Sequence, residues 1–364
     1  MSGDIDTTRT DIERWILSEL SPSRSTTAEL SYDRMESQSG RCLPVIYRPL
    51  DYSKRSHWQD TGLIAAFTEA LRGARRVLDI GPGDGWPCLR MARRFEQIVG
   101  VDPSPRRVRV QRENAERLHI HNVEFLEMDA VSLDFADRTF GGVAAASSIE
   151  QTDDPERALR EVFRVLKPGG RLAMVFEDYG EYFPESEGDE ELRVEFADGP
   201  PALFYQARSK DPARESKYGL FLDDSGVRED NELEDVLIGL ERKAVEFENL
   251  SDPSQAPSRP DTLDVRFFER LRPLVVDARY FELRHLTSET LDQILEAIGF
   301  EDIRHFDHRL PNLRRFFDAA AEDGRLDELA SSFEDIAWEF GAEAVRAAEE
   351  GPGDFAIATR PAED

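Results

Sequence analysis

The chain has 364 residues, and its 75 Asp and Glu against 46 Lys and Arg give a formal net charge of −29. This charge excludes nucleic acid as an expected partner, because binding a phosphate backbone needs clustered Lys and Arg, and it disfavours docking on anionic lipid. No apolar run in the sequence approaches the roughly 20 residues of a membrane span, and residues 1–14 lack the charged-then-apolar order of a signal peptide. The two cysteines, Cys42 and Cys88, are too few for a disulfide framework or a zinc site. We therefore expect a cytoplasmic protein.

The first 60 residues form a segment of mixed character. The pattern predicts a helix over 12–20, then a polar stretch and an aromatic-rich run. A second predicted helix, over 61–71, leads into the first apolar strand.

That strand, Val77 to Ile80, runs into a turn with three glycines, and a helix opens at Pro87. A short apolar run bounded by turn residues is typical of a buried parallel strand. Gly81, Gly83 and Gly85 allow a sharp turn and leave room for a ligand to approach the backbone. Proline is favoured at the first helical position, and we expect the free N–H groups of this helix start to face the ligand.

Two nucleotide-binding motifs are excluded at this turn. The dinucleotide motif G-x-G-x-x-G, entered from Gly81, needs a glycine at position 86, where the chain has Trp86. The motif G-x-x-x-x-G-K-[ST] needs Lys-Ser or Lys-Thr after the glycines, and neither follows.

Further apolar runs alternate with helical stretches, which favours a parallel α/β sheet. The predicted strands are 98–102, 123–128, 142–148 and 171–176, and the helices between them are 105–118 and 156–166.

Acidic side chains lie at the ends of the first three strands: Asp79, Asp102 and Asp129. In open α/β sheets, ligands bind outside the carboxyl ends of the strands. Asp102 follows the glycine turn by a little under about 20 residues, the spacing at which a carboxylate reaches a ribose diol. Taken singly, Asp79 fits a strand-end cap and Asp102 a helix cap. The ordered set favours a ligand site.

The glycine turn closely resembles motif I of class I S-adenosylmethionine-dependent methyltransferases, an apolar strand with an acidic residue followed by G-x-G-x-G. The matching residues are Asp79, Gly81, Gly83 and Gly85. The segment Leu-Lys-Pro-Gly-Gly-Arg-Leu, residues 166–172, is similar to the post-motif segment of the same family.

This resemblance covers residues 74–176 well, and 287–308 and 355–359 more loosely. It implies an α/β fold with a Rossmann-like seven-stranded methyltransferase sheet, mostly parallel with the last strand antiparallel, and an inserted α+β subdomain. It also implies S-adenosyl-L-methionine as cofactor, with the ribose at Asp102 and the adenine amino group near Asp129. The implied cofactor-binding residues are Asp79, Gly81, Pro82, Gly83, Asp102, Pro103, Ser104, Asp129, Ala130, Ser147 and Ser148.

Few catalytic groups are needed, because methyl transfer from a sulfonium is an in-line displacement in which the protein mainly aligns donor and acceptor. A general base helps only if the acceptor must lose a proton early. The candidates are Glu150 and Gln151, where many family members carry polar residues facing substrate; for Glu150 the alternative is a solvated loop carboxylate. Weaker candidates are Tyr179, Asp178 and His57, while Tyr32, Tyr47 and Trp58 either touch the cofactor or pack in a core.

We expect no metal. The histidine pairs His119/His121 and His305/His308 lack further ligands nearby in the sequence, and such histidines are more often surface or packed residues.

The chain is expected to divide into an N-terminal cap segment, a cofactor-binding core and two insertions. The insertion after the fifth strand either forms a substrate lid or dimer contact, or is a structural addition only. The predicted parts are 1–60 (cap), 61–178 (Rossmann-like core), 179–286 (inserted subdomain), 287–311 with 352–364 (completion of the core sheet) and 312–351 (helical insertion).

The sequence thus predicts methyl transfer to a small-molecule acceptor, through an O, N or C nucleophile. The alternative is a catalytically inactive protein of methyltransferase fold that senses the cofactor or assembles through its insertions. Apart from a small-molecule substrate, the expected partner is a second copy of the chain, bound through the insertions.

Overall fold

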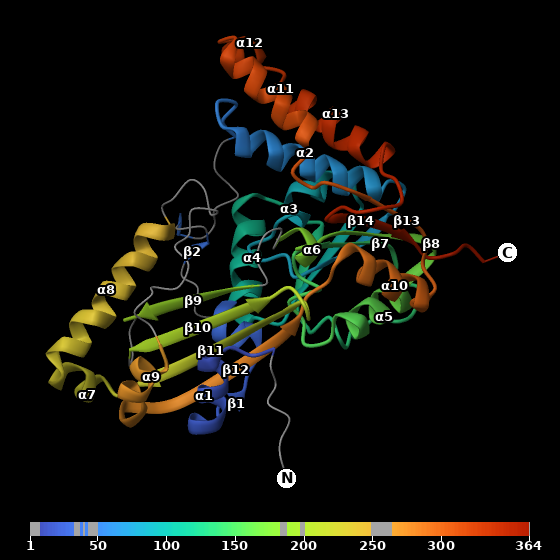
Figure 1. Ribbon diagram of the computed structural model, residues 1–364. Coiled ribbons are helices and arrows are strands. Elements are labelled where there is room, and N and C mark those ends of the chain that lie inside the picture. The colour runs from blue at the N-terminus through green and yellow to red at the C-terminus, as the bar shows by residue number, and fades with distance from the viewer. Residues whose placement is uncertain are drawn as a thin grey trace. The chain divides into compact units, whose positions relative to one another are not determined.

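The computed structural model describes residues 8–32, 37–38, 41–42, 50–182, 188–196, 201–248 and 264–363. The chain divides into two compact units (Figure 1). Residues 43–178 and 286–364 form one, which we call the parallel-sheet unit, and residues 1–42 and 179–285 form the other, the insertion unit. Within the described ranges, no helix is long and apolar enough to cross a membrane.

The parallel-sheet unit contains seven strands in the order β13-β14-β8-β7-β4-β5-β6. Strands β4 to β8 pair in parallel, whereas β14 runs antiparallel to both β8 and β13. This confirms the predicted Rossmann-like sheet with its last strand antiparallel. The strands are β4 Arg76–Ile80, β5 Gln97–Asp102, β6 Val123–Glu127, β7 Phe140–Ala146, β8 Leu166–Val175, β13 Glu301–Phe306 and β14 Phe355–Thr359.

Helices cover both faces of this sheet, because its central strands are apolar on both sides. In β4, Leu78 and Ile80 belong to a core cluster with α5 and α10, whereas Val77 belongs to a second cluster with α2, α3 and α4. The helices are α2 Arg55–Ala70, α3 Cys88–Met91, α4 Pro105–Arg117, α5 Pro155–Val165 and α10 Ser288–Ile298.

Most predicted strand limits hold to within two residues, and three elements differ in a way that has structural consequences. β8 begins at Leu166 instead of 171, because the backbone of Gly169 and Gly170 bonds to that of Arg360 at 2.9 and 2.8 Å and so extends the strand. α2 begins at Arg55 instead of 61. The helix after the glycine turn is a single turn, α3, continued by a 3₁₀ turn over Ala92–Arg94.

A helical extension lies between β13 and β14 and packs along α2 (Figure 1). A Cβ atom on Gly341 would lie only 1.8 Å from the carbonyl oxygen of Gly62, so the two helices approach closely where glycines face each other. Trp58 is fully buried against Phe317 and Phe333 of this extension, at ring-centroid distances of 5.7 and 5.5 Å. Trp58 is therefore a core residue. The helices are α11 Pro311–Glu322, α12 Leu326–Leu329 and α13 Phe333–Arg346.

The insertion unit is an α+β structure around a five-stranded sheet in the order β1-β12-β11-β10-β9. Neighbouring strands of this sheet pair antiparallel, except that β1 runs parallel to β12. One face packs an apolar core against the helices, with Leu203, Leu220 and Phe268 among its members. The strands of this sheet are β1 Ser23–Arg24, β9 Gly188–Glu195, β10 Ala202–Ser209, β11 Arg214–Leu222 and β12 Val275–Arg284. The helices are α1 Asp11–Leu20, η1 Ala28–Tyr32, α6 Tyr179–Tyr182, α7 Asp224–Glu229, α8 Asn231–Glu248, α9 Val265–Leu271 and η5 Arg272–Leu274. Two further short strands, β2 Ser37–Gln38 and β3 Arg41–Cys42, pair with each other.

The N-terminal 42 residues belong to the insertion unit, which differs from the separate cap segment 1–60 that we predicted. Helix α1 buries Glu13 completely, and the guanidinium of Arg214 on β11 bonds its carboxylate at 2.7 Å. Burial alone would raise the pKa of Glu13, but the bonds from Arg214 outweigh it and the pKa is lowered. This link joins chain segments 201 residues apart, so no local sequence pattern announces it. Of the other predicted aromatic contacts, Tyr32 lies on η1 of this unit and Tyr47 lies outside the described residues.

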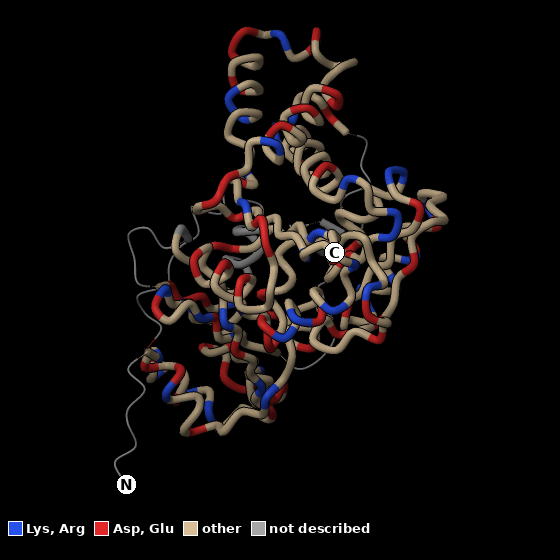
Figure 2. Tube along the Cα trace, turned by 90° about the vertical axis from the view of Figure 1, so that its right-hand side faces the viewer, with Lys and Arg blue, Asp and Glu red and all other residues tan. Residues whose placement is uncertain are grey.

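Acidic and basic residues are interspersed along both units (Figure 2). Many arginines form surface ion pairs with a carboxylate one helical turn away, such as Arg160 with Glu156 at 2.6 Å. Exposed pairs of this kind stabilise a protein only slightly, so the excess of acid bears on solubility and not on the choice of fold.

Candidate active site

The glycine turn after β4 is held by backbone and packing contacts. Gly81 has φ 63° and donates its N–H to the carbonyl of Val101 at 2.8 Å. A Cβ atom on Gly81 would lie 2.6 Å from the Cβ of Ser148, so a larger residue does not fit there. Gly83 has φ 58°, but a Cβ built on it meets nothing within 4 Å. The turn is therefore packed on one side and open beside Gly83.

Asp79 lies beneath this turn with no exposed surface. Its Oδ2 accepts the backbone N–H of Cys88 at 3.1 Å, and its Oδ1 has no partner within the described part of the chain. Burial raises the pKa of Asp79 well above its usual range, because it favours the neutral, protonated form of this side chain.

The N–H groups at the start of α3 do not face a ligand, contrary to our expectation. Cys88 donates to Asp79, Leu89 to Gly85 and Arg90 to Pro87. Burial also raises the pKa of the Cys88 thiol well above its usual range, which excludes it as a nucleophile.

Asp102 at the end of β5 is 5% exposed and is tied to the glycine turn by a residue that sequence reasoning missed. The side-chain amide of Gln111 donates to Asp102 Oδ2 at 3.2 Å and to the carbonyl of Gly83 at 2.8 Å. Asn114, one turn further along α4, donates to the carbonyl of Asp84 at 2.7 Å. Two amides of α4 therefore hold the turn beside the carboxylate.

A sequence signal for this arrangement exists. Gln111 and Asn114 are three residues apart and share the buried face of α4 with Val108 and Ala115. Polar residues at buried positions of an amphipathic helix need hydrogen-bond partners, and here the partners are the carbonyls of the turn.

The remaining predicted cofactor residues surround these two strand ends. Ser104 is buried, and its Oγ caps α4 by accepting the N–H of Arg107 at 3.1 Å. After β6, Asp129 is exposed and accepts the N–H of Val131 at 3.0 Å. Beside them, Pro103 is exposed, and Pro82 and Ala130 are buried.

The end of β7 brings Ser147, Ser148 and Glu150 to the same edge of the sheet. Ser147 is exposed with φ 49°, and Ser148 Oγ donates to the carbonyl of Ile80 at 2.6 Å. Glu150 has no exposed surface, so the alternative of a solvated loop carboxylate is wrong. Its Oε1 accepts the N–H of Glu177 at 3.3 Å, and its Oε2 has no partner among the described residues.

Burial raises the pKa of Glu150 to about 8, with a smaller contribution from the charge of Glu177. Glu150 is therefore a neutral acid at pH 7 that can donate a hydrogen bond. Gln151, the other catalytic candidate, is half-buried and donates its backbone N–H to Ser148 at 3.2 Å.

The weaker candidates form structural hydrogen bonds. Asp178 accepts the N–H of Ser288 at 3.1 Å at the start of α10. His57 is buried, and its Nδ1 accepts the N–H of Asp51 at 2.7 Å. Tyr179 belongs to the insertion unit, stacked on His285 at a centroid distance of 4.0 Å.

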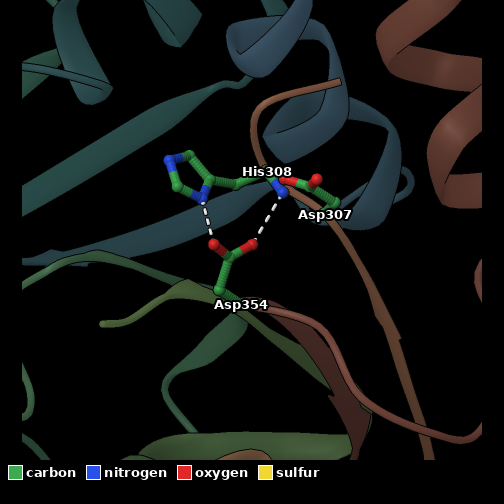
Figure 3. Close-up of side chains that lie close together, drawn as sticks. All are labelled: Asp307, His308 and Asp354. Carbon is green, nitrogen blue, oxygen red and sulfur yellow. Dashed lines mark hydrogen bonds and ion pairs between the residues drawn. The ribbon is translucent and has the colours of Figure 1, made fainter. Parts of the chain in front are cut away.

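Asp307, His308 and Asp354 lie together at the β13–β14 end of the same edge (Figure 3). One ligand atom from each side chain falls within 4.8 Å of the others. Sequence reasoning missed this cluster because His308 and Asp354 are 46 residues apart. Both carboxylates already accept hydrogen bonds: Asp354 from the backbone and ring of His308, and Asp307 from Arg309.

Comparison with known proteins shows which class of domain carries this edge. Residues 78–174 match the family model described as "Methyltransferase domain". A demethylmenaquinone methyltransferase of Thermus thermophilus is 33% identical over 133 residues, which are 36% of this chain and 59% of the relative. A 27-O-demethylrifamycin SV methyltransferase of Amycolatopsis mediterranei is 37% identical over 106 residues, 29% of this chain and 39% of the relative. The chain thus spans between about two fifths and three fifths of the length of these relatives.

Among solved structures, the CcbJ methyltransferase of Streptomyces caelestis is 17% identical, with a TM-score of 0.44 over 93% of this chain and 97% of that chain. The SAM-bound CalS10, an amino pentose methyltransferase from Micromonospora echinaspora, is 15% identical, with a TM-score of 0.42 over 83% and 91%.

The family match lies wholly within the parallel-sheet unit and runs from β4 to β8. The parallel-sheet unit is a class I methyltransferase domain, the class whose cofactor is S-adenosylmethionine. This agrees with the resemblance found in the sequence.

Proposed function

We propose that this chain transfers a methyl group from S-adenosyl-L-methionine to a small-molecule acceptor. The observation that carries the proposal is the shared edge of β6, β5, β4 and β7, where Asp129, Asp102, the open glycine turn and Ser147 follow one another. Ligands bind at this edge in open α/β sheets. The named relatives are methyltransferases, which favours the enzyme over the catalytically inactive alternative.

The residues present fit the cofactor. The space beside Gly83 lets the backbone approach a ligand closely. We assign the ribose hydroxyls to Asp102, whose carboxylate already accepts hydrogen bonds from Ser104 and Gln111, because a carboxylate only accepts and each of its oxygens can take more than one hydrogen bond. We assign the adenine amino group to Asp129. When bound, the sulfonium supplies an electrophilic methyl group, and Asp79, Gly81, Pro82, Pro103, Ser104, Ala130, Ser147 and Ser148 complete the proposed cofactor site.

The acceptor is proposed to lie beyond β7, next to Glu150 and Gln151. The relatives are named for demethylmenaquinone and 27-O-demethylrifamycin SV, both small molecules. As a neutral acid, Glu150 would orient a polar acceptor group by donating a hydrogen bond from Oε2. We also propose that the protein is cytoplasmic and that it forms a homodimer through the insertion unit.

Cofactor binding is tested by Gly83→Ala, with Gly324→Ala as matched control. Both glycines have positive φ (58° and 68°), and a Cβ built on either meets nothing within 4 Å, so the two substitutions cost similar backbone strain. We expect Gly83→Ala to weaken S-adenosylhomocysteine binding about tenfold or more in calorimetry, because its methyl group occupies ligand space, roughly 1.4 kcal/mol. Gly324→Ala should bind as the unchanged chain does. Failure of the unchanged chain to bind S-adenosylmethionine or its demethylated product would refute the proposal.

Turnover is tested by methyl release into a small-molecule extract, with Asp102→Ala as the cofactor-site control. Binding without any methyl release would support the inactive alternative instead.

A further inference from the structure

A histidine–carboxylate pair lies at this edge of the sheet, beyond Glu150. His308 follows the end of β13 by two residues, and Asp354 immediately precedes β14. The Asp354 carboxylate accepts the backbone N–H of His308 at 2.7 Å and lies 2.6 Å from ring Nδ1 (Figure 3). We propose that His308 is the general base that takes the proton from a hydroxyl acceptor, and that Asp354 positions its ring. This inference rests on the proposed function.

The hydrogen bond fixes the tautomer of the ring. Burial by itself would raise the pKa of Asp354. The hydrogen bonds from His308 together have the larger, opposite effect, so the pKa is lowered overall. Asp354 is therefore an ionised carboxylate, which only accepts hydrogen bonds. Nδ1 must then carry the proton, and Nε2 carries the lone pair that a base needs.

The exposure of the two side chains suits these roles. The side chain of His308 is 35% exposed, whereas that of Asp354 is 11% exposed. The imidazole extends to the side opposite Asp307 (Figure 3). The imidazole of His308 is thus partly accessible to a ligand, and the carboxylate that orients it is largely shielded from water.

A continuous series of hydrogen bonds joins the pair to the glycine turn. The carbonyl of Asp354 accepts the N–H of Phe176, which directly follows β8, at 3.0 Å. The carbonyl of Val175 accepts the N–H of Ser147 at 2.8 Å, and Ser148 Oγ donates to Ile80 at 2.6 Å. The His308–Asp354 pair and the glycine turn therefore lie along one edge of the sheet, which β14, β8, β7 and β4 build.

Strand spacing gives the distance between the pair and the glycine turn. Neighbouring strands lie about 4.8 Å apart, so β14 and β4 are separated by about 14 Å. With adenine at β6 and ribose at β5, the sulfonium lies toward β4 and β7. The acceptor would then lie over β7 and β8, between the glycine turn and the pair formed by His308 after β13 and Asp354 before β14.

The proposed step balances. The acceptor oxygen forms a bond to the methyl carbon while the carbon–sulfur bond breaks, and that electron pair remains on the thioether sulfur. The hydroxyl proton passes to Nε2 of His308, and the resulting imidazolium is stabilised by the Asp354 carboxylate. The pair then returns its proton to solvent.

A metal site is the competing use of the same residues. A divalent cation would have to displace the hydrogen bonds that both carboxylates accept from His308 and Arg309. It would also lie beside the Arg309 guanidinium, whose charge repels a cation. The geometry therefore favours the base.

Two phenols of different acidity test the proposal. Phenol resembles the tyrosine side chain, with a pKa of about 10, and must lose its proton during transfer; 4-nitrophenol is ionised near neutral pH and needs no base. We expect His308→Asn and Asp354→Asn to lower kcat/KM for phenol by about 100-fold or more. The same variants should change kcat/KM for 4-nitrophenol by less than about threefold, as expected when only a proton acceptor is lost.

His121→Asn is the matched control, because His121 is an exposed histidine just before β6, at the opposite edge of the sheet. Equal losses on both phenols, or transfer to neither phenol by a chain that binds S-adenosylhomocysteine, would overturn the inference. Loss of phenol methylation in EDTA with recovery in Mg²⁺ would also overturn it, in favour of a metal site. Failure of S-adenosylhomocysteine to bind would instead refute the proposed function, so the two failures are distinguishable.

A measurement independent of activity is the tautomer itself. Long-range ¹H–¹⁵N spectra of the imidazole should show His308 protonated at Nδ1, and Asp354→Asn should shift it toward Nε2–H. An Nε2–H ring in the unchanged chain would contradict the role given to Asp354.

Discussion

Glu13 in the insertion unit and Glu150 in the parallel-sheet unit are both fully buried acids, but their surroundings shift their pKa values in opposite directions. In the insertion unit, Glu13 is fully buried but paired with Arg214, and its pKa is lowered. In the parallel-sheet unit, Asp79 and Glu150 are equally buried and form no ion pair with any residue that the structure describes. Their pKa values are raised. The Glu13–Arg214 pair joins distant segments of the insertion unit, whereas Asp79 and Glu150, whose neutral forms are favoured by burial, lie at the edge of the sheet where ligands bind.

The largest effect should come from breaking the pair in the insertion unit. Arg214→Met removes the closer cation of the buried Glu13 carboxylate and leaves Arg9 at 3.7 Å, which should cost about 3–5 kcal/mol of unfolding free energy. Trp15 lies in the core cluster of this unit, so its fluorescence during urea unfolding reports the change. The double variant Glu13→Gln/Arg214→Met should recover part of the loss. A loss below about 1 kcal/mol in the single variant would show that the pair is not needed.

A smaller effect of opposite sign is expected for Glu150→Gln. The folded chain keeps the Glu150 proton up to a pKa of about 8, whereas the unfolded chain releases it near 4.5. Stability is therefore lost as pH rises from about 4.5 to about 8, and glutamine removes this loss. Relative to the unchanged chain, the variant should gain about 2–4 kcal/mol between pH 5 and pH 9, since each pKa unit corresponds to about 1.4 kcal/mol. An equal stability difference at both pH values would mean that Glu150 is ionised in the folded chain.

The smallest effect is expected for Asp79→Asn. The amide oxygen still accepts the N–H of Cys88, and burial at this position favours an uncharged group. Its unfolding free energy should therefore change by less than about 1 kcal/mol, whereas Asp79→Leu, which orphans the Cys88 N–H, should lose about 1–3 kcal/mol. Thermal unfolding at pH 7 measures both, and a large loss in Asp79→Asn would show that the carboxylate is charged.

Much of the parallel sheet could be predicted because its signals are local. The run Val77–Ile80 before the glycines, and the later apolar runs, each specify a buried strand without reference to distant residues. The start of β8 could not be predicted, because its first residues pair with Arg360 near the other end of the chain. The same limit hid the docking of α1, whose Glu13 meets a partner 201 residues away.

At the candidate site, sequence reasoning identified the residue types at the strand ends but not what holds them. Gln111 and Asn114 could have been recognised from the sequence as polar residues on a buried helix face. The burial of Glu150 could not be predicted, because a glutamate in a polar loop is usually solvated. His308 and Asp354 meet only because β13 and β14 bring the two ends of the helical extension together.

The pairing of β1 with β12 has a consequence for synthesis of the chain. Ser23 pairs with Arg279, so the sheet of the insertion unit is completed only after β12 has been made. By then β4 to β8 have already left the ribosome, and they are followed only later by β13 and β14. Neither unit can close before the other has begun, and helix α1 must wait, with its apolar face uncovered, for strands that are made later. Nascent chains truncated before β12 should therefore be the ones that chaperones hold longest.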